Sequence, residues 1–277
     1  MADIYGSHFE YAGTTSLRHG LIIANVETER FTRVYGEIES VSFFNKSNSR
    51  RHLIADNYAN SPISIEVEML TDRQKPIEPS ERRAIERWLF NRTKYEKFYL
   101  DMGDDSTGET FEYVDGVCKR LYLNCRFVNP KKLEYNGGIV GYSATLEADS
   151  GLWWQDAITK TYTLENESAS DSSMITVNLD TDSRTFTYPK VTIQMGSAGG
   201  NITVANYTDD STRTTRFIDL SASTRVILNG ETNYISGQNY EKFYKQNFPR
   251  LLDGANSVYV AGAVNSITFE FNNRRFL

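Results

Sequence analysis

The feature that most constrains the fold is a strict alternation of apolar and polar residues in ISIEVEM, residues 63–69. Successive side chains of a β-strand point to opposite faces of the sheet, so this pattern predicts a strand with one buried face. A second run of the same kind, YSATLEA, occupies residues 142–148. Aromatic residues make up 13% of the chain, including 17 Tyr and 15 Phe, and this favours sheet over helix. The sequence therefore predicts a mainly β protein.

Four further segments of the N-terminal half have strand-like composition. They are residues 21–26, 33–44, 97–102 and 120–128. The glycine-bounded segment 103–108 between the last two is expected to be a loop.

One helix is expected in residues 79–91. Ser80 is the predicted N-cap, and Glu81 lies in the first turn, where its charge favours the helix dipole. Apolar residues recur at i, i+1, i+4 and i+5 from Ala84, which gives one buried stripe. Trp88 lies in this stripe, and we interpret it as a core residue.

The length of 277 residues favours two domains, although one large all-β domain is an alternative. Composition shifts to Ser, Asp, Asn and Thr in residues 165–184, and short strands separated by turns follow to the C-terminus. Asn229 and Gly230 are a strong signal for a two-residue hairpin turn. This spacing indicates a sandwich or barrel. We predict an N-terminal domain at 1–160, with a β-sandwich or barrel-like fold and one helix, and a C-terminal β-sandwich at 161–277.

The charge balance argues against specific nucleic-acid binding. The formal net charge is −6, and the basic pairs Arg50, Arg51 and Lys131, Lys132 are isolated, whereas phosphate binding needs a basic patch. A mildly acidic wall would suit a channel through which nucleic acid slides. No apolar run is long enough to cross a membrane, and residues 1–10 lack a secretory signal pattern, so neither a membrane span nor export is expected.

The residue types that carry metal or nucleophilic chemistry do not form a recognisable motif. His8, His19 and His52 lack metal-ligand spacing. Cys118 and Cys125 are seven residues apart in one predicted strand, which places them on opposite faces, and we expect reduced thiols. The glycine-rich segment 196–200 lacks the features of a phosphate-binding loop.

Two acidic pairs and one aromatic set leave alternatives open. Asp104, Asp105 and Asp209, Asp210 are interpreted as solvated turns, with a cation site or catalysis as alternatives. The aromatic set is interpreted as core and interface packing, with stacking on sugar rings as the alternative. It consists of Tyr234, Tyr240, Phe243, Tyr244 and Phe248. We expect no catalytic, cofactor-binding or metal site.

The order and spacing of several segments resemble the distal tail protein family of long-tailed bacteriophages. A Trp-Leu pair near a helix end leads into an aromatic-rich strand, and FPRLLDGAN, residues 248–256, is similar to the family's Phe-Pro-x-Leu-x-x-Gly-x-Asn turn. The other matching segments are residues 15–25 (TSLRHGLIIAN), 84–90 (AIERWLF), 95–101 (YEKFYLD), 122–128 (YLNCRFV), 141–148 (GYSATLEA), 267–271, and Arg274 with Arg275.

The resemblance implies a non-enzymatic structural protein of the phage tail tip, made and assembled in the bacterial host cytoplasm and located in the virion. Six copies would form a ring through the N-terminal domain, between the major tail tube protein and the tail-tip or tail-associated protein. DNA would pass through the ring during ejection. A galectin-like C-terminal β-sandwich would project outward and carry or contact receptor-binding components.

Two other functions stay open at this point. One is a carbohydrate-binding or host-adhesion module, which would bind glycans and form no ring. The other is a different ring-forming phage protein, such as a tail-tube or baseplate-hub protein. An enzyme is disfavoured, because no constellation of residues supports one.

Overall fold

The computed structural model describes residues 8–24, 38–45, 50–58, 62–72, 75–101, 111–183, 185–236 and 240–275. Contacts divide the chain into two compact units, one extending to Gln155 and the other from Asp156 to Arg275. Antiparallel strands dominate both, which confirms the predicted mainly β class. The domain limits 1–160 and 161–277 stay a prediction, and each unit is described by itself.

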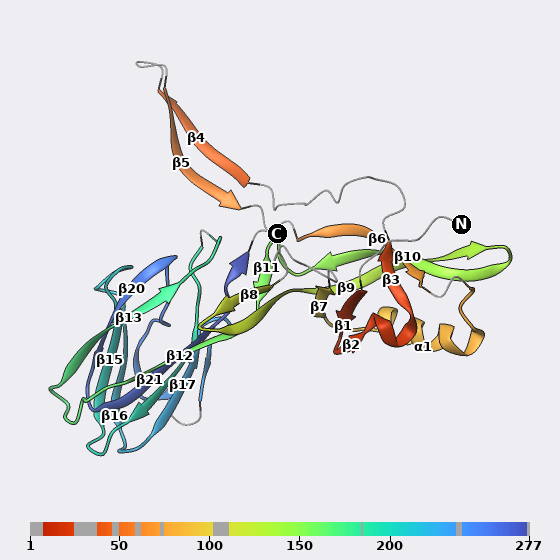
Figure 1. Cartoon of the computed structure of the whole chain (residues 1–277). Helices are drawn as coiled ribbons and strands as arrows, with labels where there is room; N and C mark the ends of the chain where they lie inside the picture. Colours follow the sequence, from red (N-terminus) through yellow and green to blue (C-terminus); the bar gives the residue numbers. More distant parts are fainter. Residues whose placement is uncertain are drawn as a thin grey trace. The chain divides into compact units, whose positions relative to one another are not determined.

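The first unit is built on an antiparallel sheet in the order β2-β1-β7-β9-β10-β6-β3 (Figure 1). Two more strands, β8 and β11, pair with β9, while β4 and β5 form a separate two-stranded sheet. The strands are β1 His8–Tyr11, β2 Thr14–Thr15, β3 Leu21–Ala24, β4 Ile38–Asn45, β5 Arg50–Tyr58, β6 Ser64–Thr71, β7 Glu96–Asp101, β8 Phe111–Val114, β9 Val117–Tyr135, β10 Gly138–Ala148 and β11 Trp153–Gln155.

The alternating segments form the two strands predicted from them. In β6, Val67 and Met69 are buried, while Glu66 is exposed. Strand β10 pairs with β6 and buries every second residue from Tyr142 onward. The strands predicted at 97–102 and 120–128 correspond to β7 and the middle of β9. The strand predicted at 21–26 corresponds to β3, and the one at 33–44 to β4, with residues 25–26 and 33–37 outside the described part. The predicted loop 103–108 also lies outside it.

Tight two-residue turns connect several neighbouring strands. Asp115 and Gly116 join β8 to β9, and Asn136 and Gly137 join β9 to β10. All four residues have positive φ, between 48° and 78°. That geometry matches a type I′ turn, whose twist fits the twist of the two strands it joins. These turns make β9, which is 19 residues long, the central member of three consecutive strands, β8, β9 and β10.

The predicted helix is α1, Pro79–Phe90, and a short 3₁₀ helix, η1, spans Ser16–His19. The prediction of Ser80 as N-cap was wrong. Glu78 is the N-cap residue and Pro79 occupies the first helical turn, where its fixed φ suits the helix and its missing N–H costs nothing. Ser80 is therefore already inside the helix.

The stripe of α1 that faces the sheet joins an aromatic core, as predicted for Trp88. The Trp88 ring stacks on Phe9 at 5.6 Å between centroids, and its Nε1 donates a hydrogen bond of 2.9 Å to the Tyr11 carbonyl oxygen. Tyr11 and Phe127 meet edge to face at 4.9 Å. Trp88 is 6% exposed, so its polar N–H needs this acceptor inside the core. The indole therefore fixes α1 against β1 both by packing and by a directional bond.

The second unit is a β-sandwich of two five-stranded antiparallel sheets, ordered β12-β21-β14-β17-β18 and β13-β20-β15-β16-β19 (Figure 1). Large apolar residues fill the space between the sheets, among them Phe217 and Phe269, each 0% exposed. The strands are β12 Ile158–Thr163, β13 Ser172–Leu179, β14 Lys190–Met195, β15 Gly200–Asn206, β16 Thr214–Leu220, β17 Arg225–Asn229, β18 Tyr234–Ile235, β19 Phe243–Gln246, β20 Gly254–Ala261, β21 Val264–Phe271 and β22 Arg274–Arg275.

Two local expectations for this unit differ from the structure. The polar stretch 165–184 contains the edge strand β13, whose exposed residues are mostly polar, so strands occur earlier than the expected run after residue 184. The predicted hairpin at Asn229 exists, but its connection has four residues, because Asn229 pairs with Tyr234. The Asn229 side chain accepts hydrogen bonds from the Glu231 and Thr232 N–H groups, which stabilises this longer loop.

We expect Trp88→Ala to lower the free energy of unfolding of the full chain by about 3–5 kcal/mol, because it opens a cavity and leaves the Tyr11 carbonyl unpaired. Urea unfolding followed by circular dichroism measures the change. Tyr135→Ala is the control, since Tyr135 is 69% exposed and its removal should cost less than about 0.5 kcal/mol. Equal losses in the two variants would contradict the role given to Trp88.

Candidate functional site

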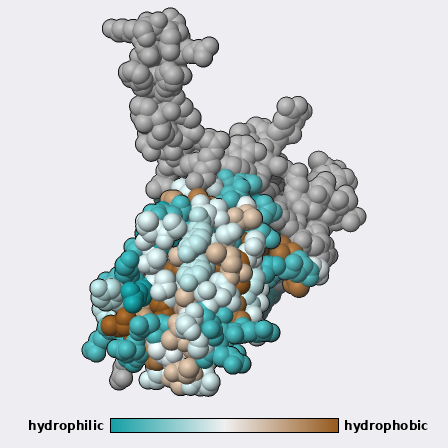
Figure 2. Space-filling model, turned by 90° about the vertical axis from the view of Figure 1, so that its left-hand side faces the viewer, coloured by the Kyte–Doolittle hydropathy of each residue, from teal (hydrophilic) through white to brown (hydrophobic). Residues whose placement is uncertain are grey.

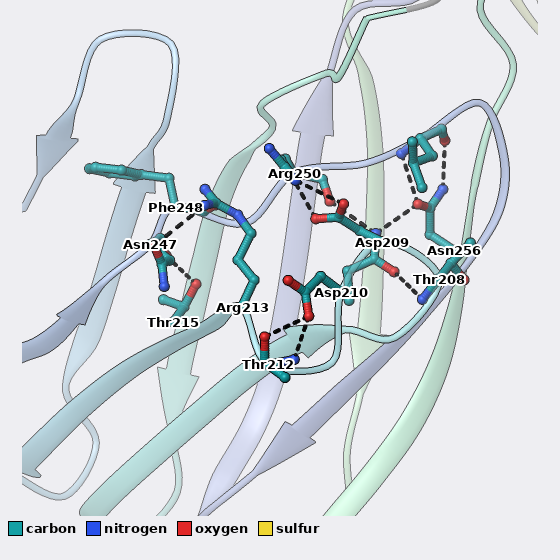
Figure 3. Close-up of polar contacts among 12 residues, drawn as sticks. Thr208, Asp209, Asp210, Thr212, Arg213, Thr215, Asn247, Phe248, Arg250 and Asn256 are labelled. Carbon is teal, nitrogen blue, oxygen red and sulfur yellow. Dashed lines mark hydrogen bonds and ion pairs between the residues drawn. The ribbon is translucent and has the colours of Figure 1, made fainter.

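A densely connected polar cluster surrounds the segment 248–256 in the second unit (Figure 3). Its last residue, Asn256, is 0% exposed. Asn256 Nδ2 donates to the carbonyl oxygens of Leu252 at 2.8 Å, Gly254 at 3.1 Å and Val177 at 3.3 Å. Asn256 Oδ1 accepts from the Leu252 N–H at 2.9 Å and from Asn206 Nδ2 at 2.8 Å. One buried side chain thus satisfies backbone groups of an irregular segment that would otherwise lack partners.

A charged pair lies beside this amide. Arg250 makes two hydrogen bonds to the Asp209 carboxylate, at 2.7 and 2.9 Å. The Arg250 guanidinium also lies 3.6 Å from the centre of the Phe186 ring. The hydrogen bond to Asp209 is the main reason that the pKa of Arg250 is raised above its usual value. The two hydrogen bonds fix the relative orientation of the two charged side chains. The pair therefore connects the 248–256 segment to the turn after β15.

The interpretation of Asp209 and Asp210 as a solvated turn was wrong for Asp209 and held for Asp210. The side chain of Asp209 is only 8% exposed, because Arg250 covers it. Asp210 accepts hydrogen bonds from the Thr212 hydroxyl at 2.7 Å and the Thr212 N–H at 2.8 Å. The Thr212 hydroxyl, followed by its N–H, lowers the pKa of the Asp210 carboxyl below its usual range. Both carboxylates therefore stabilise the local structure through hydrogen bonds within the protein.

A shallow pocket opens next to these residues. Arg213 donates to the Asn247 side chain at 3.4 Å and to the Phe248 carbonyl at 3.1 Å, while the Thr215 hydroxyl donates to the Asn247 carbonyl (Figure 3). The lining also includes Pro249, Leu251 and Phe269. Its charged groups form hydrogen bonds with the protein itself, and Ser, Cys and His are missing from the lining. The hydroxyl in the lining, that of Thr215, donates to the Asn247 carbonyl and not to a base. The arrangement therefore suits a rigid connection between loops and offers no activated nucleophile.

The predicted aromatic set is divided between core and surface. Phe243 is 3% exposed and stacks on Phe217 at 4.7 Å, as expected for packing. Tyr234, Tyr240 and Tyr244 are 54%, 59% and 63% exposed. On the face drawn in Figure 2, hydrophobic residues form small separate spots among hydrophilic ones. Such a surface is ordinary for a globular protein.

The histidines and cysteines considered in the sequence belong to the first unit. His8 Nδ1 lies 3.2 Å from the Leu21 carbonyl oxygen, and the His19 ring stacks on Trp88 at 4.8 Å. Cys118 is exposed and Cys125 is buried, and neither forms a disulfide, as predicted. Burial raises the pKa of the Cys125 thiol above its usual value.

The side chain of His52 and the pair Asp104, Asp105 lie outside what the structure describes. Within the described ranges, no group of three or more His, Cys, Asp or Glu residues could hold a metal ion. The helices described there are all too short or too polar to cross a membrane.

A sequence signal could have identified Asn256 as a buried residue with a structural role. Asn256, Val258 and Val260 occupy alternate positions of β20, and all three are buried. A polar residue on the apolar face of a strand must find hydrogen-bond partners inside the core. The position of Asn256 in this alternation thus indicates a structural amide.

Models of two phage tail families match the chain, one for each unit. A model described as phage tail protein N-terminal domain matches residues 4–150, and a model described as phage tail C-terminal domain matches residues 157–271. Among curated proteins, none matches the chain.

Solved structures of phage baseplate components have a similar fold. The Dit protein of phage SPP1, described as a paradigm of the hub adsorption apparatus in phages that infect Gram-positive bacteria, is 11% identical, with a TM-score of 0.63 over 98% of this chain and 100% of that one. A chain of the phage P2 baseplate, activated with Ca, is 8% identical, with a TM-score of 0.52 over 99% and 100%. The same baseplate activated with Sr gives 7% identity and a TM-score of 0.52 over 98% and 99%. At these identities the likeness concerns the fold.

We expect Asn256→Asp to destabilise the full chain by about 3–5 kcal/mol at pH 7, because a buried carboxylate would face three carbonyl oxygens. These carbonyls and burial raise the folded-state pKa of the new carboxyl. Its destabilising effect is therefore smallest below the unfolded pKa of about 3.9 and grows as the pH rises toward the folded value. Denaturant unfolding of variant and wild type at pH 3.5, 5 and 7 measures this difference.

Asn178→Asp is the matched control, because Asn178 lies exposed on β13. It should change stability by less than about 0.5 kcal/mol at each pH. A loss at Asn256 that does not depend on pH would contradict the hydrogen-bond directions assigned to its side chain.

Proposed function

The chain belongs to the phage tail protein family, and we propose that it is a non-enzymatic structural component of the tail tip that assembles as a hexameric ring. The main support for this proposal is the order in which the two family models match the chain, together with the extent of the structural likeness. Both units match phage tail models in sequence order, and 98% of the chain overlays on the whole SPP1 Dit protein.

The proposed ring joins the major tail tube protein to the tail-tip or tail-associated protein. Six copies associate through the first unit, and DNA passes through the central opening during ejection. The net charge of −6 favours passage without adhesion to the wall, since like charges repel. The second unit carries or contacts receptor-binding components. The protein is synthesised in the host cytoplasm and ends in the virion.

Sheet physics and the polar cluster support a structural role. An exposed strand edge tends to pair with another chain unless it is protected, and a closed ring gives such contacts without free ends. The cluster around Asn256 consists of side chains that hold backbone segments in place, which suits a rigid connector.

Light scattering of the purified chain tests the assembly. Six chains of 31.6 kDa give 189.6 kDa, and this mass is the expected result. Negative-stain images should show particles with six-fold symmetry. A chain that stays a monomer even after the tail tube protein is added would contradict the hexamer.

A further inference from the structure

The exposed side of α1 carries two cations and no acid. Arg83 and Arg87 are both exposed and four residues apart, which places them one above the other on the helix surface. Within the described part of the chain, neither side chain has a hydrogen bond or ion pair. Glu86, which comes three residues after Arg83 and directly before Arg87, pairs with Lys132 at 3.0 Å. Like charges at this spacing repel, so the stripe favours an anionic partner.

The outward face of β6 carries the opposite charge. Glu66 and Glu68 alternate with the buried Val67 and Met69 and therefore point away from the core. Their cross-strand neighbours on β10 are the uncharged Thr145 and Ser143. Within the described residues, neither glutamate has an ion-pair partner.

The two pairs lie on opposite sides of one layered unit. Helix α1 packs on the inner side of the sheet through Ile85 and Leu89, which share the core with Val67 and Met69 (Figure 1). The spacings also correspond. Helix residues at i and i+4 have Cβ atoms about 5–6 Å apart, and strand residues at i and i+2 are about 6.6 Å apart. Both ion pairs can therefore form at once between two chains.

We propose that Arg83 and Arg87 of one copy pair with Glu66 and Glu68 of the next copy. The basic and the acidic surface differ and lie on opposite sides of the unit, so each copy carries one surface for each of its two neighbours. That is a heterologous contact, which closes into a ring when the rotation allows. The inference rests on the proposed hexamer and specifies its contact. Exposed charge pairs mainly set partner choice, register and association rate, so assembly should weaken as salt rises.

Charge reversal with complementation tests this contact. One variant is Glu66→Lys with Glu68→Lys, and the other is Arg83→Glu with Arg87→Glu. In each variant both surfaces have the same sign, so each should stay monomeric at concentrations where wild type is hexameric. In an equimolar mixture every contact joins surfaces of opposite sign if the two variants alternate. A ring of six allows strict alternation, and light scattering should return to the wild-type mass.

The matched control is Glu165→Lys with Glu167→Lys, the same change at the same spacing in the exposed start of the second unit. It should assemble like wild type. Thermal melting of every variant confirms that it is folded. A wild type that stays monomeric even after the tail tube protein is added would contradict the hexamer itself. Two results with a hexameric wild type would overturn this contact alone. In one, both reversal variants are also hexameric. In the other, the variants are folded monomers that do not assemble when mixed.

Discussion

The carboxamide of Asn256 connects β13, β15 and the 248–256 segment within the second unit through five hydrogen bonds. An irregular segment that closes the end of a sandwich carries backbone N–H and C=O groups without ladder partners. Leaving one such group buried and unpaired costs about 1–3 kcal/mol. Asn supplies two donors and an acceptor on one short side chain, and this combination meets the need at a single point. The Arg250 pair with Asp209 then holds the adjacent turn.

The first unit solves a related problem by different means. Its helix α1 must be fixed on a sheet whose own hydrogen bonds are already used along the strands. The Trp88 indole supplies apolar area and one donor, which reaches the Tyr11 carbonyl at the short strand β1. In both units, a polar atom placed inside apolar surroundings fixes where an element lies, because alternative positions would leave that atom unpaired.

The sequence predicted the strands well where one face is buried, because period-2 alternation directly reports burial in β6 and β10. It was less informative for turns. Asn229 and Gly230 have the same signal as Asn136 and Gly137, yet only the latter form a two-residue turn. The residues after each glycine account for the difference. Gly138 begins a strand rich in β-formers, whereas polar residues come after Gly230, and the Asn229 side chain bonds their N–H groups.

Features that depend on the partner of a side chain were beyond sequence reasoning. Ser80 is a residue type that often caps helices, but Pro79 is favourable as the first helical residue. The N-cap is therefore the residue before Pro79, which is Glu78. Asp209 sits in a polar turn, and its burial depends on Arg250, which is 41 residues away. The alternation of Asn256 with Val258 indicates that Asn256 is buried. Its five hydrogen bonds involve three segments that lie together only in the folded chain.

The proposed role as a connector would require the chain to keep its fold while it contacts neighbours on both sides. Strand ladders resist separation through many parallel hydrogen bonds, and the polar clusters join the irregular ends to those ladders. Opposite charges on the two sides of the first unit would add direction, because they distinguish one neighbour from the other before close packing begins. A chain with these rigid contacts and oppositely charged surfaces would suit the closed assembly proposed above.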